Sequence, residues 1–249
     1  MGKMGKKIFK IGTRTSPLAL KQVDEVLRLL HKFYPDIKAD IIRIDTYGDK
    51  DKVTPISDIE GTDFFTREIE DSLLNSRIDF AVHSAKDMPD ALPGGLRIAA
   101  ITESIDPHDA LVSKKGLRLD ELPHGAAIGT SSARRKAQLK AYRGDFSIVD
   151  IRGNIEERLK LVDETDLDAI VIAACGLIRL GLDSRISQRI PLEILRPHPL
   201  QGSLVVETRN DRSDLIELFS NIDSRRKKDT FQAEQETLSR LDWKASLDL

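Results

Sequence analysis

Residues 7–33, KIFKIGTRTSPLALKQVDEVLRLLHKF, decide the fold class of the chain. KIFKIG (7–12) predicts a short strand, and a helix is expected next because Ser16 suits an N-cap and Pro17 suits the first helical position. The apolar residues of this helix recur every three or four positions, on one face: Leu20, Val23, Leu27 and Leu30. A strand followed by an amphipathic helix predicts a βα unit whose helix packs on a sheet.

The same alternation continues along the first hundred residues. The segments are ADIIRIDT (39–46) as a strand, FFTREIEDSLLNSR (64–77) as a helix, IDFAVHS (78–84) as a strand and LRIAAIT (96–102) as a strand. Strands separated by helices form parallel sheets with helices on both faces. The first part of the chain therefore predicts a mostly parallel sheet.

The pattern begins again after residue 105. GAAIGTSSARRKAQLKAY (125–142) and SIVDIRGNIEERLKLV (147–162) each predict a strand, a turn and a helix, and DAIVIAACGLIRLG (168–181) predicts a strand and a turn. LQGSLVVETRN (200–210) predicts a strand that returns to the first sheet. We expect an α/β protein of two periplasmic-binding-protein-like lobes, with mostly parallel sheets around a hinged cleft. The first lobe comprises residues 1–104 and 198–222, the second 105–197, and the polar tail 223–249 is too short for a domain.

Composition excludes several classes of protein. Of 249 residues, 32% are charged and 5% aromatic, and the net charge of -2 argues against binding to nucleic acid or to a membrane surface. No apolar run is long enough to span a bilayer and the start lacks a secretory signal, so a cytoplasmic location is expected. The single cysteine, Cys175, excludes an internal disulfide, and the five scattered histidines indicate no metal centre.

Arginine gathers at the turns between strands and helices. In IGTSSARRKAQ (128–138), hydroxyls stand at a helix N-terminus with Arg134 and Arg135 in its first turn, where cations oppose the helix dipole unless an anion binds. Further arginines follow strands or lie near their ends: Arg14, Arg152, Arg158 and Arg179. Guanidinium groups suit a ligand with several carboxylates or phosphates. A solvated, internally paired surface explains any one of these arginines better than a binding site does, but it explains poorly why so many of them fall at strand exits on the same edge.

The stretch AVHSAKDMPD (81–90) places Lys86 and Asp87 where a buried strand ends. Open α/β sheets bind ligands at this edge, so Asp87 is a candidate to stabilise a cation or to transfer protons. The alternative is an ion pair that closes the strand. A P-loop, a GxGxxG and a GxSxG motif are all missing, which disfavours nucleotide binding and serine hydrolysis.

Together these segments resemble the porphobilinogen deaminase (hydroxymethylbilane synthase) family, from about Ile8 to Leu241. The segments that resemble it are IGTRTSPLAL, DFAVHSAKDMP, IGTSSARR, RGNIEERL, AACGLIRLGL and LQGSLVVETR. The resemblance implies an enzyme that removes ammonia from porphobilinogen and joins four units head to tail into a linear tetrapyrrole for porphyrin and heme biosynthesis. It also implies a dipyrromethane cofactor.

The resemblance assigns roles to individual residues. Asp87 would stabilise the azafulvene cation that forms as ammonia leaves and assist proton transfer at the pyrrole nitrogen. The acetate and propionate groups would be held by Arg14, Arg134, Arg135, Arg152, Arg158 and Arg179. Further substrate or cofactor contacts fall on Ser16, Lys86, Thr130, Ser131, Ser132 and Gln201. Phe65 belongs to the segment over the active site.

The chain departs from the family at its C-terminal end. RLDWKASLDL (240–249) has Ala245 where the family attaches the dipyrromethane cofactor to a cysteine, so the usual thioether cannot form there. Residues 223–249 are expected to be a remnant of the third domain. Cys175 is the alternative anchor. Asp58 and Thr62 also stand where lysines are usual.

Three hypotheses remain open from the sequence. The chain is a shortened deaminase with a primer that is non-covalent or attached elsewhere, or it binds a polycarboxylate pyrrole without turnover, or its third domain comes from a separate polypeptide. Besides porphobilinogen, uroporphyrinogen III synthase, the next enzyme, is a partner to test.

Overall fold

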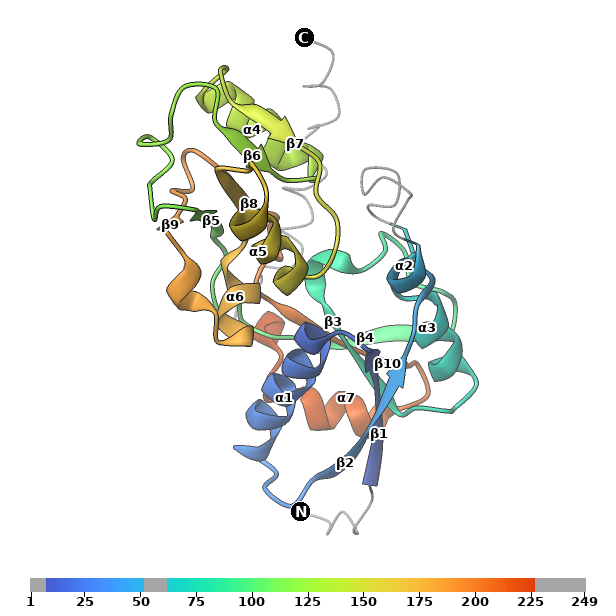
Figure 1. Ribbon diagram of the computed structural model, residues 1–249. Coiled ribbons are helices and arrows are strands. Elements are labelled where there is room, and N and C mark those ends of the chain that lie inside the picture. Colours follow the sequence, from blue (N-terminus) through green and yellow to red (C-terminus); the bar gives the residue numbers. More distant parts are fainter. Residues whose placement is uncertain (1–7, 52–61, 227–249) are drawn as a thin grey trace. The chain divides into compact units, whose positions relative to one another are not determined.

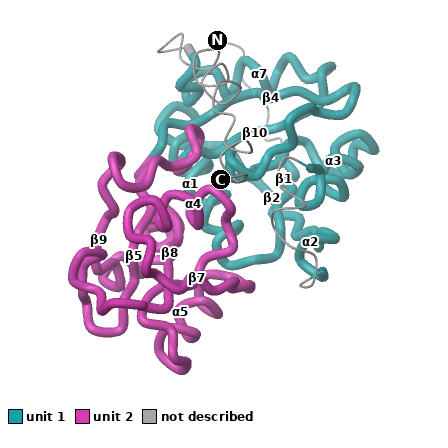
Figure 2. Tube along the Cα trace, turned by 90° about the horizontal axis from the view of Figure 1, so that it is seen from above, with its two compact units in different colours: residues 1–51, 60–104, 203–231 teal, residues 52–59, 105–202, 232–249 magenta. Residues whose placement is uncertain are grey.

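The computed structural model describes residues 8–51 and 62–226 (Figure 1). The predictions made at Asp58 and Ala245, and nearly all of the expected third-domain remnant, lie outside the described residues. The chain forms two compact units, shown in Figure 2. The described part of unit 1 comprises residues 8–51, 62–104 and 203–226, and unit 2 comprises residues 105–202.

Unit 1 is a five-stranded sheet with helices on both faces. Its elements are β1 (Ile8–Arg14), α1 (Pro17–His31), β2 (Lys38–Ile44), α2 (Tyr47–Lys50), α3 (Arg67–Leu74), β3 (Phe80–Ser84), the 3-10 turn η2 (Ala85–Asp87), β4 (Leu96–Ile101), β10 (Leu204–Arg209), α7 (Ser213–Phe219) and η4 (Ser224–Arg226). The strand order is β2-β1-β3-β10-β4. β1 runs parallel to β2 and β3, whereas β10 runs antiparallel to β3 and β4.

Unit 2 has a five-stranded sheet of its own. Its elements are β5 (Asp109–Ser113), β6 (Ala127–Gly129), α4 (Ala133–Tyr142), β7 (Ser147–Val149), α5 (Ile155–Glu164), β8 (Ala169–Ala173), α6 (Ala174–Leu180), η3 (Asp183–Arg185) and β9 (Gln188–Arg189). The strand order is β7-β6-β8-β5-β9. β6 is parallel to β7 and β8, whereas β5 is antiparallel to β8 and β9.

The expected α/β class with two lobes is confirmed, and the strand directions refine it. Among the described strands, each sheet has two parallel and two antiparallel pairings, so the sheets are mixed rather than mostly parallel. The antiparallel strands are β10 and β5, each of which follows a passage of the chain from one unit to the other. Apolar runs in a sequence indicate strands but carry no direction, so the mixture could not be read from them.

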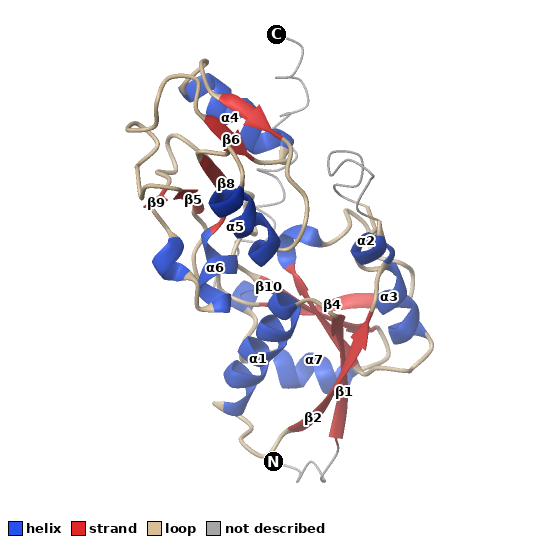
Figure 3. Ribbon diagram, viewed as in Figure 1, coloured by secondary structure: helices blue, strands red, loops and turns tan. Residues whose placement is uncertain are grey.

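Packing in unit 1 follows the alternation of side chains along β3. Phe80 and Val82 lie in the core formed with α1 and α7, while Ala81 packs with Ile69 and Leu73 of α3 on the other face. Figure 3 shows α1 and α3 flanking the strands. Successive strand residues point to opposite faces, so position along β3 decides which layer a side chain meets.

Helix α1 begins as the sequence predicted. The Ser16 hydroxyl accepts a hydrogen bond from the backbone N–H of Ala19 at 3.2 Å, and Pro17 occupies the first turn. Val23, Val26 and Leu30 are fully buried against the sheet. The start of this helix is therefore fixed beside the end of β1, which positions Arg14. No helix in the described part of the chain is long and apolar enough to cross a membrane.

Strand β1 of unit 1 and strand β6 of unit 2 each contain a glycine that lies close to an isoleucine side chain. Gly12 of β1 pairs with Ala81 of β3, and Gly129 of β6 pairs with Ile170 of β8. A Cβ on Gly12 would lie 2.2 Å from Cδ1 of Ile78, and a Cβ on Gly129 would lie 2.9 Å from Cγ2 of Ile151. Both glycines therefore allow a neighbouring isoleucine to approach the strand closely. Each is followed by a turn at the edge where ligands bind in α/β sheets.

Candidate functional site

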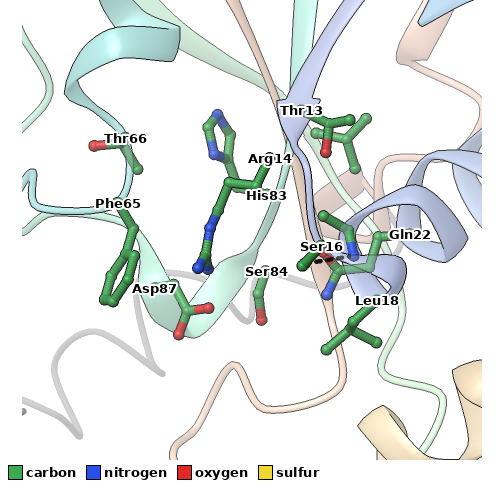
Figure 4. Close-up of a pocket in the computed structure, with 12 residues that line it drawn as sticks. Thr13, Arg14, Ser16, Leu18, Gln22, Phe65, Thr66, His83, Ser84 and Asp87 are labelled. Carbon is green, nitrogen blue, oxygen red and sulfur yellow. Dashed lines mark hydrogen bonds between the residues drawn. The ribbon is translucent and has the colours of Figure 1, made fainter. Parts of the chain in front are cut away.

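A pocket in unit 1 collects several of the residues that the sequence singled out (Figure 4). The end of β1, the start of α1, the segment before α3 and the end of β3 all contribute to it. The predicted residues that line it are Arg14, Ser16, Phe65 and Asp87. Thr13 and His83 line it as well. Residues from three separate parts of the sequence thus meet at one edge of the sheet.

Asp87 is presented by a short turn at the end of β3. The strand ends at Ser84, and the turn η2 is held by the Met88 N–H, which donates to the carbonyl of Ala85 at 3.5 Å. The Ala85 N–H donates to the carbonyl of Ser203 at 3.0 Å, so the turn is also fixed to the segment before β10. Asp87 is exposed and Lys86 is half-buried. The Asp87 carboxylate is therefore accessible from the pocket.

Arg14 is held in place by a carboxylate that sequence reasoning missed. Its Nε and Nη2 donate to Oδ1 of Asp49 at 3.1 and 2.5 Å, and its guanidinium carbon lies 4.4 Å from the centre of the Phe65 ring. Burial alone would raise the pKa of Asp49, but the guanidinium and Thr46 outweigh it and lower that pKa. Arg14 remains 27% exposed, so it can still face a ligand. The spacing of Thr46 and Asp49 is a capping signal that would have located this carboxylate.

In unit 2 three hydroxyls lie between β6 and α4. The Ser131 hydroxyl donates to the carbonyl of Ile151 at 2.7 Å and accepts from its N–H at 2.9 Å. Ser132 is the N-cap of α4 and makes no capping bond with its side chain. The Thr130 hydroxyl is buried and has no hydrogen-bond partner among the described residues. Thr130 and Ser132 thus leave donors at a helix N-terminus, a favourable place for an anion.

Arg134 and Arg135 both bind Asp109, the first residue of β5. Nη2 of Arg134 lies 2.8 Å from Oδ2, and Nη2 of Arg135 lies 2.6 Å from Oδ1. The Gln201 amide donates to the same Oδ1 at 3.0 Å and to the carbonyl of Pro107 at 2.7 Å. Burial would raise the pKa of Asp109, but the two guanidinium groups hold it well below its usual value. We call these four residues the Asp109 clamp.

The remaining predicted residues are placed separately in unit 2. Arg152 is half-buried before α5, and Nε of Arg158 donates to the carbonyl of Gly153 at 2.8 Å. Nη2 of Arg179 donates to the carbonyl of Gly202 at 2.8 Å. Cys175, in the first turn of α6, is 5% exposed. The substrate contacts predicted for these residues stay predictions.

The fold and the site define a class of protein. Two α/β units present a carboxylate, arginines and hydroxyls at the carboxyl ends of their strands, as expected of an enzyme or binding protein for a small polyanionic ligand.

Comparison with known proteins gives the family. Residues 9–217 match the family model described as "Porphobilinogen deaminase, dipyromethane cofactor binding domain". The chain is 47% identical over 227 residues to the porphobilinogen deaminase of Syntrophomonas wolfei, covering 91% of this chain and 73% of that protein. It is 46% identical over 234 residues to that of Natranaerobius thermophilus, covering 94% and 75%. The chain therefore belongs to the porphobilinogen deaminase family, and the resemblance is confirmed.

Among solved structures, a periplasmic binding protein of Salmonella typhimurium matches with a TM-score of 0.44 and 12% identity, over 93% of this chain and 98% of that one.

Proposed function

We propose that the pocket around Asp87 carries the reaction of the family in this chain. The protein is a hydroxymethylbilane synthase, a transferase of porphyrin and heme biosynthesis that joins four porphobilinogen units head to tail. The observation that carries the assignment of the site is the exposed carboxylate of Asp87 in one pocket with the half-exposed guanidinium of Arg14.

Asp87 suits the charge that the reaction creates. The bond between the methylene carbon and the protonated amine nitrogen of porphobilinogen breaks, ammonia leaves with the electron pair of that bond, and a cation remains on the pyrrole. A fixed carboxylate stabilises this cation. A new bond then forms between that carbon and the free ring carbon of the terminal pyrrole, and Asp87 accepts the proton lost from the ring and passes it to solvent.

Arg14 suits the acetate and propionate groups of the substrate. Its hydrogen bonds to Asp49 and its stacking on Phe65 fix the plane of the guanidinium before a ligand arrives. A guanidinium group that is already held in place loses less conformational entropy on binding a carboxylate than a mobile side chain does. Arg14 therefore positions the substrate relative to Asp87, and Ser16 and Lys86 are proposed contacts of the same substrate.

The residues of unit 2 fit the dipyrromethane cofactor, which also carries carboxylates. The buried Thr130 hydroxyl without a partner and the N-terminus of α4 at Ser132 offer donors for such a group. When bound, the cofactor supplies the terminal pyrrole to which substrate units are added. Ala245, at the position of the usual anchor, lies outside the described residues. Cys175, the alternative anchor, is buried. An intact mass under denaturing conditions, with or without two added pyrrole units, decides between covalent and non-covalent attachment.

The test of the assigned site is Asp87→Asn. We expect ammonia release from porphobilinogen to fall by about 100-fold or more, because the carboxylate that stabilises the cation and moves the proton is lost. Ammonia and the linear tetrapyrrole are measured together. Asp90→Asn is the matched control, since Asp90 is an exposed aspartate of the same loop outside the pocket.

Wild-type turnover in Asp87→Asn would refute the assignment of Asp87. Tight binding of porphobilinogen by the wild-type chain without ammonia release would favour a binding protein instead. Uroporphyrinogen III synthase, a separate third domain and a cytoplasmic location stay predictions.

A further inference from the structure

Three ionisable side chains are buried together in unit 1. Glu70 of α3 is 2% exposed, His83 of β3 is 5% exposed and Glu207 of β10 is 0% exposed. Nε2 of His83 lies 3.2 Å from Oε2 of Glu207, within ion-pair distance but not aligned as a hydrogen bond. Both Glu207 oxygens and Oε1 of Glu70 have no hydrogen-bond partner among the described residues. We call these three residues the buried array.

Strand register places the array on one face of the sheet. Ala81 pairs with Glu207 and His83 pairs with Val205 in the antiparallel ladder of β3 and β10. His83 and Glu207 therefore point to the same face as Ala81, and that face packs against α3. Glu70 lies on α3, one position after the core residue Ile69. Thus the fold brings the three groups together, although they are distant in the sequence.

The charges of the array must be balanced inside the protein. An isolated buried carboxylate is costly, and the Glu207 carboxylate is compensated by the His83 imidazole that faces it at 3.2 Å. Burial raises the pKa of Glu70, and the charges of Glu207 and Asp63 raise it further, while Thr66 and His83 oppose them. Glu70 thus keeps its proton to a higher pH than an ordinary glutamic acid does. Protonated Glu70 beside the compensated pair of His83 and Glu207 leaves the array neutral.

The array lies directly behind the pocket. His83 and Thr66 both line the pocket, and Thr66 follows Phe65, which stacks on Arg14. Figure 4 shows the His83 ring pointing away from the Asp87 carboxylate. His83 is also three residues before the turn that presents Asp87. The array therefore connects β3, β10 and α3 at the inner wall of the pocket.

We infer that Glu70, His83 and Glu207 keep the inner wall of the Asp87 pocket neutral and so set the pH range in which it binds its substrate. This inference rests on the proposed function, because the substrate carries acetate and propionate groups. Loss of the proton on Glu70 leaves a buried negative charge behind the pocket, which repels those groups. The three side chains are positioning residues, since they act through the field in the pocket rather than on the reacting atoms.

The first test is the KM for porphobilinogen from about pH 5, just above the ordinary pKa of a glutamic acid, to about pH 9, in the wild type and in Glu70→Gln. For the wild type we expect KM to rise by about fivefold as the Glu70 proton is lost, with a smaller change in kcat. Glu70→Gln keeps the shape but cannot ionise, so its KM should stay flat over the same range. If its KM profile superimposes on that of the wild type, the inference is wrong.

A matched control and a second pair of variants separate charge from packing. Asp223→Asn also removes a buried carboxylate of unit 1, one that accepts from the Ile101 N–H at 3.1 Å, and it should keep the wild-type shape of the KM profile. Glu207→Gln is expected to retain substrate affinity better than His83→Gln does. The reason is that His83→Gln leaves the buried Glu207 carboxylate without its counter-charge, and this negative charge repels the acidic groups of the substrate. Equal KM values in these two variants would count against the array.

Urea unfolding tests the array without turnover. A raised pKa means that the folded state binds the Glu70 proton more tightly than the unfolded state, so this part of the stability is present at low pH and is lost as pH rises through the folded pKa. The wild-type midpoint should fall relative to that of Glu70→Gln as pH rises. If the wild type releases no ammonia, the proposed function fails. Independently of that result, urea midpoints of the wild type and Glu70→Gln that differ by the same amount at every pH would refute the inference about the buried array.

Discussion

The segments at the carboxyl ends of β1 and β6 start with the same sequence but differ in where their charged side chains lie. Both begin IGT, and in both the threonine hydroxyl is buried without a hydrogen-bond partner among the described residues, at Thr13 and at Thr130. In unit 1 the next residue is Arg14, which stays 27% exposed on the pocket. In unit 2 the next residue is Ser131, bonded to Ile151, and the cations lie on α4.

The difference lies in the carboxylate that each set of arginines meets. Asp49, beside Arg14, is 18% exposed, whereas Asp109, between Arg134 and Arg135, is 0% exposed. A pair near solvent leaves its guanidinium able to exchange partners, while a buried group with two cations holds elements together. The same IGT sequence therefore precedes a solvent-accessible arginine in unit 1 and a buried cluster of ion pairs in unit 2.

Removing the carboxylate of the Asp109 clamp should have the largest effect on stability. Asp109→Asn leaves two guanidinium groups without their buried counter-charge, so we expect a loss of about 3–5 kcal/mol in the free energy of unfolding. Urea unfolding measures it. The control is Asp163→Asn, which removes the half-exposed partner of Arg185 in the same unit and should cost about 1 kcal/mol or less. Equal losses would show that burial does not distinguish the two pairs.

The partner of Arg14 should matter for binding more than for stability. Asp49→Asn weakens the hold on the guanidinium but leaves its stacking on Phe65. We expect KM for porphobilinogen to rise by about threefold to tenfold with kcat within about twofold, because positioning is loosened and Asp87 is untouched. Steady-state kinetics of ammonia release measure both. A fall in kcat with unchanged KM would show that Asp49 does not act through substrate binding.

The sequence predicted the lobes, the turns and Asp87 because each depends on local signals. Ser16 and Pro17 mark a helix start, and the exit of an apolar strand marks the edge where Asp87 lies. The clamp and the buried array were missed because their members lie on different elements, far apart in the sequence, and meet only in the folded chain. Asp109 opens β5 and Glu207 lies inside β10, and both strands join their sheets antiparallel to a neighbour. A carboxylate within an apolar strand indicates that the carboxylate has a buried partner, but the sequence does not show which residue that partner is.

Replacing Thr13 and Thr130 should have the smallest effect on stability, and it tests whether the two IGT segments serve ligands. Thr13→Val and Thr130→Val each replace a buried hydroxyl without a partner by a methyl group of similar size. Neither should lower the free energy of unfolding by more than about 0.5 kcal/mol, since no hydrogen bond between described residues is lost. If the hydroxyls serve ligands, Thr13→Val weakens porphobilinogen binding and Thr130→Val weakens retention of the cofactor. Calorimetric unfolding together with KM and the pyrrole content of the purified protein would separate these effects. Two variants that lose stability but bind normally would mean that the repeated threonine serves the scaffold in both units.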